Sequence, residues 1–169
     1  MVSPGGLTKR WDAPYGKATS EEFSLQTVEI NPSIAFKVNP QFALGAGVRV
    51  VYAKGKVISN SSDISTATGG AVPSVARDMK GDTFAYGFNL ALSYKPTEEL
   101  SIGLTYRSNI DLDIKGDAKL FANGAQVYNS SASVSVPLPA SLNIAFAYDV
   151  LPSTTIELVY ERTYWSAYE

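Results

Sequence analysis

Apolar and polar residues alternate along most of this chain, with a period of two rather than the 3.6 of an amphipathic helix. The clearest example runs from Thr83 to Tyr94, where even positions are aromatic or leucine and odd positions are small or polar. Successive side chains of a β-strand point to opposite faces. The segment is therefore predicted to be a strand with one apolar face and one small, polar face, on which Asn89 lies.

The same alternation predicts six long strands, arranged as three hairpins. They are expected at about 22–38, 42–52, 83–94, 100–115, 134–149 and 154–165. The first strand is irregular, because Phe23 and Leu25 fall on the face opposite to Val28 and because Asn31-Pro32 interrupts it. A proline inside a strand marks an edge, a kink or a bulge. Either the apolar face switches before Val28, or Phe23 and Leu25 point to the polar side.

The predicted connections alternate in length. Short, proline-marked turns are expected near 38–41, 95–98 and 150–153, whereas the stretches 59–79 and 117–132 are rich in Ser, Gly, Asn and Ala and are predicted to be loops. Short turns at one end and long loops at the other are typical of outer-membrane β-barrels.

A soluble antiparallel sandwich also alternates apolar and polar residues, but three features favour a membrane barrel. The strands are long, the polar faces are too small and polar to form half of a packed core, and aromatic residues such as Tyr86 and Tyr94 lie at both ends of the apolar stripes. Ten tilted residues span about 25 Å, the height of the apolar band of such barrels. The fold class is thus all-β: a segment of an antiparallel transmembrane barrel in a bacterial outer membrane.

Six strands are too few to close a membrane barrel, because single-chain barrels begin at about eight. We therefore expect residues 1–169 to form part of a larger barrel, with assembly of several chains as the alternative. No run approaches the 18 apolar residues of a transmembrane helix.

The composition excludes several classes of function. A formal charge of −2 and a pI near 5.2 argue against nucleic acid as a partner. The chain has no cysteine and no histidine, so it offers neither a thiolate metal site nor a Ser-His-Asp or Cys-His arrangement. Asp111, Asp113 and Asp117 could suggest calcium, but strand geometry puts only the first two on one face, which favours a solvated rim. We expect no enzyme, no metal and no cofactor.

Six short motifs, in order along the chain, resemble the FadL family of outer-membrane transporters. They are PGGLTKRW (4–11), LQTVEINPSIAFKV (25–38), LGAGV (44–48), YGFNL (86–90), GLTYRS (103–108) and LPAS (138–141). Each is weak alone, but the ordered set covers nearly the whole chain.

The resemblance implies a 14-stranded barrel, monomeric when complete, that is plugged by an N-terminal hatch. Such proteins admit long-chain fatty acids or hydrocarbons by facilitated diffusion and release them sideways through a gap in the wall. The implied partners are outer-membrane lipid and a hydrophobic small molecule. The hatch and the remaining strands have no counterpart in residues 1–169, so the resemblance implies a middle section and carries over no hatch residue.

Arg107 lies in the GLTYRS motif, on the face predicted to line the lumen. It could meet the carboxylate of an entering fatty acid, or it could be a structural arginine paired with Asp111, Glu157 or another inward carboxylate. The structural interpretation is favoured. Arg49 has the same two interpretations.

The other positions predicted to face the lumen supply the rest of a substrate path. They are Asn89, Asn109, Asp111 and Glu157, with Phe23 and Leu25 as apolar surface if these point inward. Asn31-Pro32 is a possible kink that opens the wall, or a bulge that only re-aims the strand.

The preferred function is passive transport of hydrophobic compounds. A general porin should show rows of arginines facing acids, but here the inward positions are mostly small and uncharged. A barrel enzyme lacks the histidine it would need, and a structural or adhesive barrel would bind a partner through 59–79 and 117–132.

Overall fold

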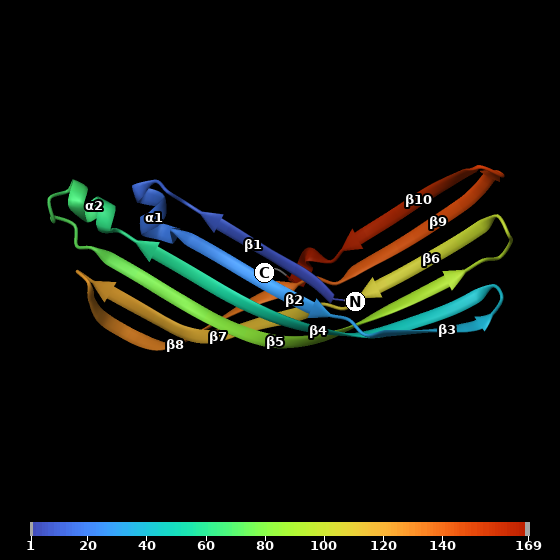
Figure 1. The fold of residues 1–169 in the computed structure, drawn as a ribbon, viewed down its shortest axis with the longest axis horizontal. Coiled ribbons are helices and arrows are strands. Elements are labelled where there is room, and N and C mark those ends of the chain that lie inside the picture. The colour runs from blue at the N-terminus through green and yellow to red at the C-terminus, as the bar shows by residue number, and fades with distance from the viewer. Residues whose placement is uncertain (1, 168–169) are drawn as a thin grey trace.

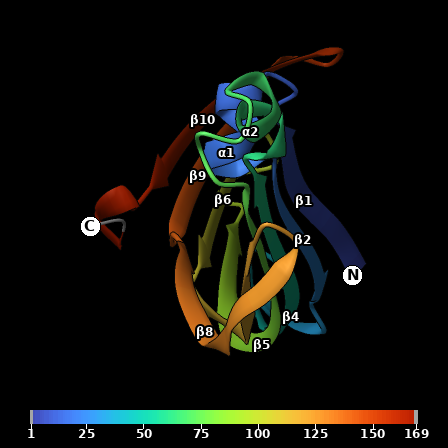
Figure 2. The ribbon, with the colours of Figure 1, turned by 90° about the vertical axis from the view of Figure 1, so that its left-hand side faces the viewer.

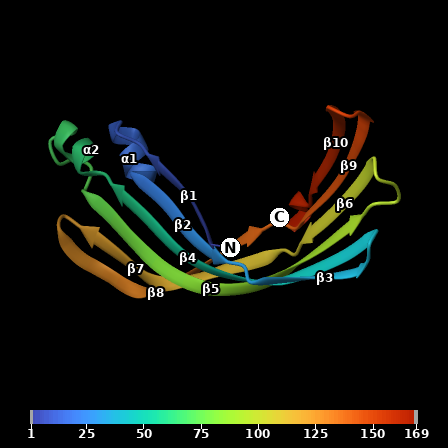
Figure 3. The ribbon, with the colours of Figure 1, turned by 45° about the vertical axis from the view of Figure 1, so that its right-hand side comes forward.

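Ten antiparallel strands form one curled sheet in the computed structural model, which describes residues 2–167 (Figure 1). The strands are β1 (Val2–Arg10), β2 (Glu22–Ile30), β3 (Ser33–Asn39), β4 (Phe42–Asn60), β5 (Val75–Tyr94), β6 (Leu100–Arg107), β7 (Ile110–Ala122), β8 (Ala125–Leu138), β9 (Ser141–Leu151) and β10 (Thr154–Thr163). Helices α1 (Pro14–Ser20) and α2 (Ser62–Ala67) stand at one end of the sheet, and a 3₁₀ turn, η1, covers Trp165–Ala167 (Figure 3). None of the helices in residues 2–167 has the length and apolarity to cross a membrane.

All six expected strands are present. Three of them are each divided in two by a short interruption, so that they appear as β2 with β3, β6 with β7, and β8 with β9. A further strand, β1, pairs with β2 along its whole length. End on, β1 and β10 lie on opposite sides of the curled sheet (Figure 2).

The outer face of the sheet carries the apolar stripes. Strands β4 and β5 pair without interruption from Phe42 opposite Tyr94 to Asn60 opposite Ala76, so even-numbered residues of both strands share this face. The Phe42 and Tyr94 rings lie 6.2 Å apart at one end of the stripe, and the Tyr52 and Phe84 rings lie 4.9 Å apart at the other. Aromatic pairs thus bound the apolar stripe at both ends, as in the girdles of membrane barrels.

The first predicted strand keeps one register through Asn31-Pro32. Ile30 pairs with Val50 before the interruption and Ser33 pairs with Gly47 after it, so no residue is inserted. Within β2, pairing with β4 runs without a shift from Glu22 opposite Ile58 to Ile30 opposite Val50, so the alternative of a switch of faces before Val28 is wrong. Phe23 and Leu25 lie on the inner face, because their partners on β4, Val57 and Gly55, are odd-numbered and the outer face of β4 carries the even-numbered residues.

The stretch 117–132 is a β-hairpin and not the predicted loop. Strands β7 and β8 pair through it, and the chain reverses at Asn123 and Gly124, whose φ angles are 49° and 82°. Asn-Gly is the most favourable pair for a two-residue hairpin turn with positive φ at both positions. Few large apolar residues mark these strands, so the hairpin depends on the turn and on backbone pairing. The stretch 59–79 holds α2, and β5 begins within it at Val75.

Strand β6 follows one half of β5 and β7 follows the other, with a step between them (Figure 1). From Asn89 to Asp82, β5 advances seven residues, whereas the paired chain advances eight, from Arg107 to Lys115. Positions 83–88 of β5 lie outside both registers, although the Ser108 N–H still donates to the Phe88 carbonyl oxygen at 2.9 Å. The extra residue turns the next strand over, as a bulge does.

Because of this reversal, the apolar residues of β7 point to the inner face of the sheet and form the core there. Ile110, Leu112 and Ile114 are 2%, 0% and 5% exposed and pack with inner-face residues of β4 and β5. The small size of those partners, Val51, Ala53 and Ala85, lets the β7–β8 hairpin approach the wall closely. The largest buried side chains of the described residues therefore lie inside the curled sheet.

Gly116 marks where β7 rejoins β5. A Cβ atom at this position would overlap the carbonyl oxygen of Lys80, which belongs to the β5 backbone. We expect Gly116→Ala to destabilise the full-length protein containing this chain by about 1–3 kcal/mol, the usual cost of overpacking. Urea unfolding followed by tryptophan fluorescence measures this, and Gly124→Ala tests strain in the neighbouring turn without a clash, because no atom lies within 4 Å there. A Gly116→Ala protein of unchanged stability would show that the two strands separate easily.

Candidate lumenal site

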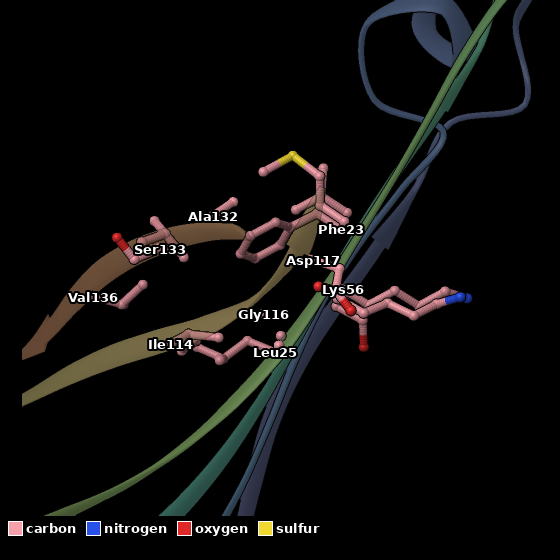
Figure 4. A pocket seen from close by; sticks show the side chains of 16 residues that line it. Phe23, Leu25, Lys56, Ile114, Gly116, Asp117, Ala132, Ser133 and Val136 are labelled. Atoms are coloured by element: carbon pink, nitrogen blue, oxygen red, sulfur yellow. The ribbon is translucent and has the colours of Figure 1, made fainter. Parts of the chain in front are cut away.

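An apolar cleft of about 150 Å³ separates the inner face of the sheet from the β7–β8 hairpin (Figure 4). Phe23 and Leu25 project into it from β2, toward Ile114 of β7 and Val136 of β8. Both residues that the sequence singled out as possible apolar lumen surface are therefore in this cleft. Their partners from the hairpin close its other side.

Glycines form much of the floor of the cleft. Gly55 in β4 and Gly81 in β5 lie beneath the hairpin, and a Cβ on Gly55 would meet the Cδ1 atom of Ile114 at 3.2 Å. The charged Lys56 belongs to the same strand, but its side chain points away from the cleft (Figure 4). The space is thus shaped by the absence of side chains and lined by hydrocarbon, which suits an apolar guest.

A charged cluster lies farther along the same inner face of β2. The Glu29 carboxylate accepts hydrogen bonds from Arg49 Nε at 3.0 Å and Nη2 at 2.9 Å. Arg107 Nη2 donates to the same carboxylate at 2.7 and 2.9 Å. Two guanidinium groups therefore share one carboxylate, which leaves the cluster with a net charge of +1.

The two arginines of this cluster differ in burial. Arg49 is 5% exposed, and its Nη1 atom also donates to the Ser108 carbonyl oxygen at 2.8 Å. The side chain of Arg107 is 46% exposed. Arg49 is thus enclosed by the wall and holds the chain where β6 ends, whereas Arg107 keeps an open side toward the lumen.

Asn89 lies in a polar group around Gly47. The inner-face space above Gly47 is filled by Asn31 and Asn89, whose Oδ1 atoms would lie 2.8 and 2.5 Å from a Cβ there, and by Ser33, which donates to Asn31 at 2.9 Å. The predicted interruption at Asn31-Pro32 therefore adjoins this group. Across it, the Val48 N–H still donates to the Pro32 carbonyl at 3.1 Å.

Two predicted lumen residues are placed differently by the structure. Because the chain turns over after Arg107, Ile110 and Leu112 take the inner face, and Asn109 and Asp111 lie on the opposite, exposed side of the strand. Their assignment to the face of Arg107 is corrected accordingly. The sequence hides the step, since the apolar residues keep even numbers on both sides of it.

Glu157 shares the inner face but lies apart from the cluster. It pairs with Ala147 on β9, whereas Arg107 lies level with Ser141, six residues away along that strand. Six residues span about 20 Å. The inward carboxylate that pairs with Arg107 is therefore Glu29, and neither Asp111 nor Glu157.

Sequence reasoning missed the hairpin side of the cleft. Alternation in the predicted strand 134–149 places Val134 and Val136 on the apolar stripe that faces lipid, but they line the cleft from β8. The only local signals are Ser108-Asn109 and Pro139-Ala140, which interrupt both strands of the hairpin at matched positions.

The sequence matches the model of a known protein family over its whole length. The model of the family described as "Outer membrane protein transport protein (OMPP1/FadL/TodX)" matches residues 1–169. The chain belongs to this family. The resemblance drawn from the six motifs, the fold class and the outer-membrane location are confirmed.

The OMPP1/FadL/TodX relatives are distant in sequence. The chain is 27% identical to the long-chain fatty acid transport protein of Escherichia coli O6:H1, over 92% of this chain and 41% of that protein. It is 26% identical to outer membrane protein P1 of Haemophilus influenzae, over 95% of this chain and 40% of that protein. The chain thus spans about two fifths of the length of these relatives.

Solved structures share the fold. A Pseudomonas aeruginosa FadL homologue superposes with a TM-score of 0.79 at 23% identity, over 98% of this chain and 45% of that one. The Ralstonia pickettii toluene transporter TbuX superposes with a TM-score of 0.70 at 18% identity, over 98% of this chain and 50% of that one. The curled sheet is accordingly the architecture of part of a FadL-type barrel.

Proposed function

We propose that this chain forms part of a channel that passively admits hydrophobic small molecules, such as long-chain fatty acids or hydrocarbons, across the outer membrane. The observation that carries the proposal is the cleft between β2 and the β7–β8 hairpin, which is lined by Phe23, Leu25, Ile114 and Val136 on the inner face. The lumen of a porin is polar and filled with water. Relatives named as fatty acid and toluene transporters support an apolar cargo.

The complete channel needs more strands than residues 1–169 supply. The outer edges of β1 and β10 have no partner strand among the described residues, and unpaired backbone is not tolerated in hydrocarbon. We infer that further strands close a monomeric barrel of 14 strands with an N-terminal hatch, as the family resemblance implies.

Arg107 is the residue of the cluster that suits a ligand carboxylate. It is half exposed and belongs to a cluster of net charge +1, whereas Arg49 is enclosed. Leu25 and Glu29 lie on the same face of β2, four residues or about 13 Å apart. A fatty acid could therefore place its carboxylate at Arg107 and its chain toward the cleft.

Sideways release would require a break in the wall. Asn31-Pro32 interrupts one strand, but the register continues across it. The wider interruption lies at positions 83–88 of β5, which neither β6 nor β7 pairs with. Both places are proposed as exits. One backbone hydrogen bond crosses each of them, from Val48 to Pro32 at the first and from Ser108 to Phe88 at the second, and the second place is the wider.

Uptake by the full-length protein in liposomes tests the proposal. We expect a labelled long-chain fatty acid to enter the vesicles while a small sugar does not. Similar rates for the sugar would instead indicate a general porin, and the cleft would then be only a packing defect.

The cleft itself can be tested at Gly55. Gly55→Val places two methyl groups beneath Ile114 and should lower fatty acid uptake about ten-fold, since extra methyl groups in a packed site cost about 1–3 kcal/mol. Gly103→Val is the control, because a Cβ at this inner-face glycine meets only Ala145 at 3.9 Å. Equal uptake by both variants would show that the substrate does not pass through the cleft.

A further inference from the structure

Lysines cover the outer face just beyond one end of the apolar stripe. The Tyr52–Phe84 ring pair ends the stripe, and the next outer positions along β4 are Lys54 and Lys56. Lys80 of β5 and Lys115 of β7 lie on the same face. The four lysines form two rows of paired residues across the strands, which we call levels: Lys54 and Lys115 share one, and Lys56 and Lys80 share the other. We call these four residues the lysine cluster.

The pairing of the strands sets two of these lysines directly opposite each other. Lys56 of β4 pairs with Lys80 of β5, so their Cβ atoms are about 5 Å apart. Like charges in directly opposite positions are destabilising. The two ammonium groups turn to different acids, Lys56 to Glu22 at 3.1 Å and Lys80 to Asp78 at 2.8 Å.

The two levels nearest the rings carry a surplus of positive charge. The first level holds Lys54 and Lys115 on either side of Asp82, and the second holds Lys56 and Lys80 beside Asp117. Four lysines thus face two aspartates. The next level carries Glu22 and Asp78 together with Arg10 and Lys119 and is neutral, so the three levels together keep a net charge of +2. Among the described residues, neither Lys54 nor Lys115 forms an ion pair within 4.0 Å.

The depth of the lysine cluster in the membrane indicates which part of the lipid lies next to its positive charge. Each step of two residues along a tilted strand advances about 5 Å across the membrane, so these ammonium groups lie about 5–10 Å beyond the rings. Lys54 and Lys56 belong to the last part of β4, which ends at Asn60 and leads into α2, and the longer connections of such barrels are extracellular. This is the headgroup level of the outer leaflet, next to the lipid-facing stripe.

We propose that the lysine cluster binds the phosphate of a phosphorylated lipid of the outer leaflet. The phosphate lies between Lys56 and Lys80, which donate to it in place of Glu22 and Asp78, with Lys54, which has no ion pair among the described residues, on its membrane side. The acyl chains lie along the apolar stripe, against Phe84 and Tyr86, which are 61% and 69% exposed. The site is on the outside of the barrel and is independent of what the lumen transports.

Lipid binding to the full-length protein in detergent, measured by native mass spectrometry, tests this site. The probes are lipid A with two phosphates, the same lipid without phosphates, and inorganic phosphate. We expect Lys56→Gln/Lys80→Gln to lower the affinity for the phosphorylated lipid at least about ten-fold, because each lysine near an anionic surface contributes about 1 kcal/mol. The phosphate-free lipid should bind equally weakly to both proteins.

Two controls separate the site from general effects. Lys95→Gln changes a lysine in the short turn at the opposite end of the sheet and should leave binding unchanged. Lys56→Arg/Lys80→Arg keeps both charges and should retain it. The proposal is overturned if the glutamine variant binds phosphorylated lipid like the wild type, or if inorganic phosphate displaces the lipid completely. The comparison of the two lipids on the wild-type protein tests the site even if the glutamine variant fails to fold.

Discussion

Replacing Arg49 by methionine should lower the free energy of unfolding of the full-length protein by about 3–5 kcal/mol, the range for removing one partner of a buried ion pair. Arg49 is 5% exposed and donates to Glu29 and to the Ser108 carbonyl. The substitution leaves Glu29 with only the half-exposed Arg107 and leaves the end of β6 without its anchor. Urea titration of the reconstituted protein, followed by tryptophan fluorescence, measures the loss.

The double variant Arg49→Met/Glu29→Gln is the matched test. It removes the uncompensated carboxylate, so it should be more stable than Arg49→Met alone. Arg107→Met should cost less than Arg49→Met, because the Arg107 side chain is 46% exposed and exposed pairs contribute little. If both arginine variants lost the same stability, the assignment of Arg49 as the enclosed anchor would be wrong.

Shortening Leu112 to alanine should destabilise the full-length protein by about 2–5 kcal/mol, the range for a buried leucine. Leu112 is fully buried and joins β7 to Ala53 and Ala85 of the wall. These partners are small and lie on paired strands, so they cannot move in to fill the cavity. The same urea titration measures the effect.

Leu158→Ala provides the comparison on a lipid-facing position. This leucine of β10 is 67% exposed on the outer face, so its replacement exchanges contacts with lipid and leaves no cavity. We expect it to cost less than about 1 kcal/mol. Equal losses for Leu112→Ala and Leu158→Ala would mean that β7 faces lipid, as the alternation of the sequence suggests.

Alternation predicted the strands well where one face meets lipid and the other meets the lumen. The stripe from Phe84 to Tyr94 is an example, because each environment accepts one class of side chain over the whole length. The same logic identified Asn89, Arg49 and Arg107 as residues of the polar face, and the structure brings the two arginines together at Glu29. Which carboxylate they would share could not be predicted, since it depends on the order of strands in space.

Alternation failed where the apolar face does not meet lipid. Tyr106 and Leu112 both have even numbers, yet they lie on opposite faces, because the chain turns over between them. A stripe packed against the inner wall and a stripe facing lipid require the same side chains, so periodicity cannot tell them apart. Strand β1 was missed for another reason. Its Pro4 and two glycines carry no alternation, and it is a strand because β2 offers it a partner.

The interruptions of the β7–β8 hairpin are matched, and this restricts how the protein can change length. Arg107 pairs with Ser141 before the break and Ile110 pairs with Leu138 after it, so both strands pass through two unpaired residues and keep one register. An insertion or deletion in one strand alone would shift every later pair and carry Leu112 away from the wall. Viable changes of length should therefore come in compensating pairs, one near Ser108-Asn109 and one near Pro139-Ala140. Insertions and deletions in these two segments, which are distant in sequence, should thus occur together during evolution.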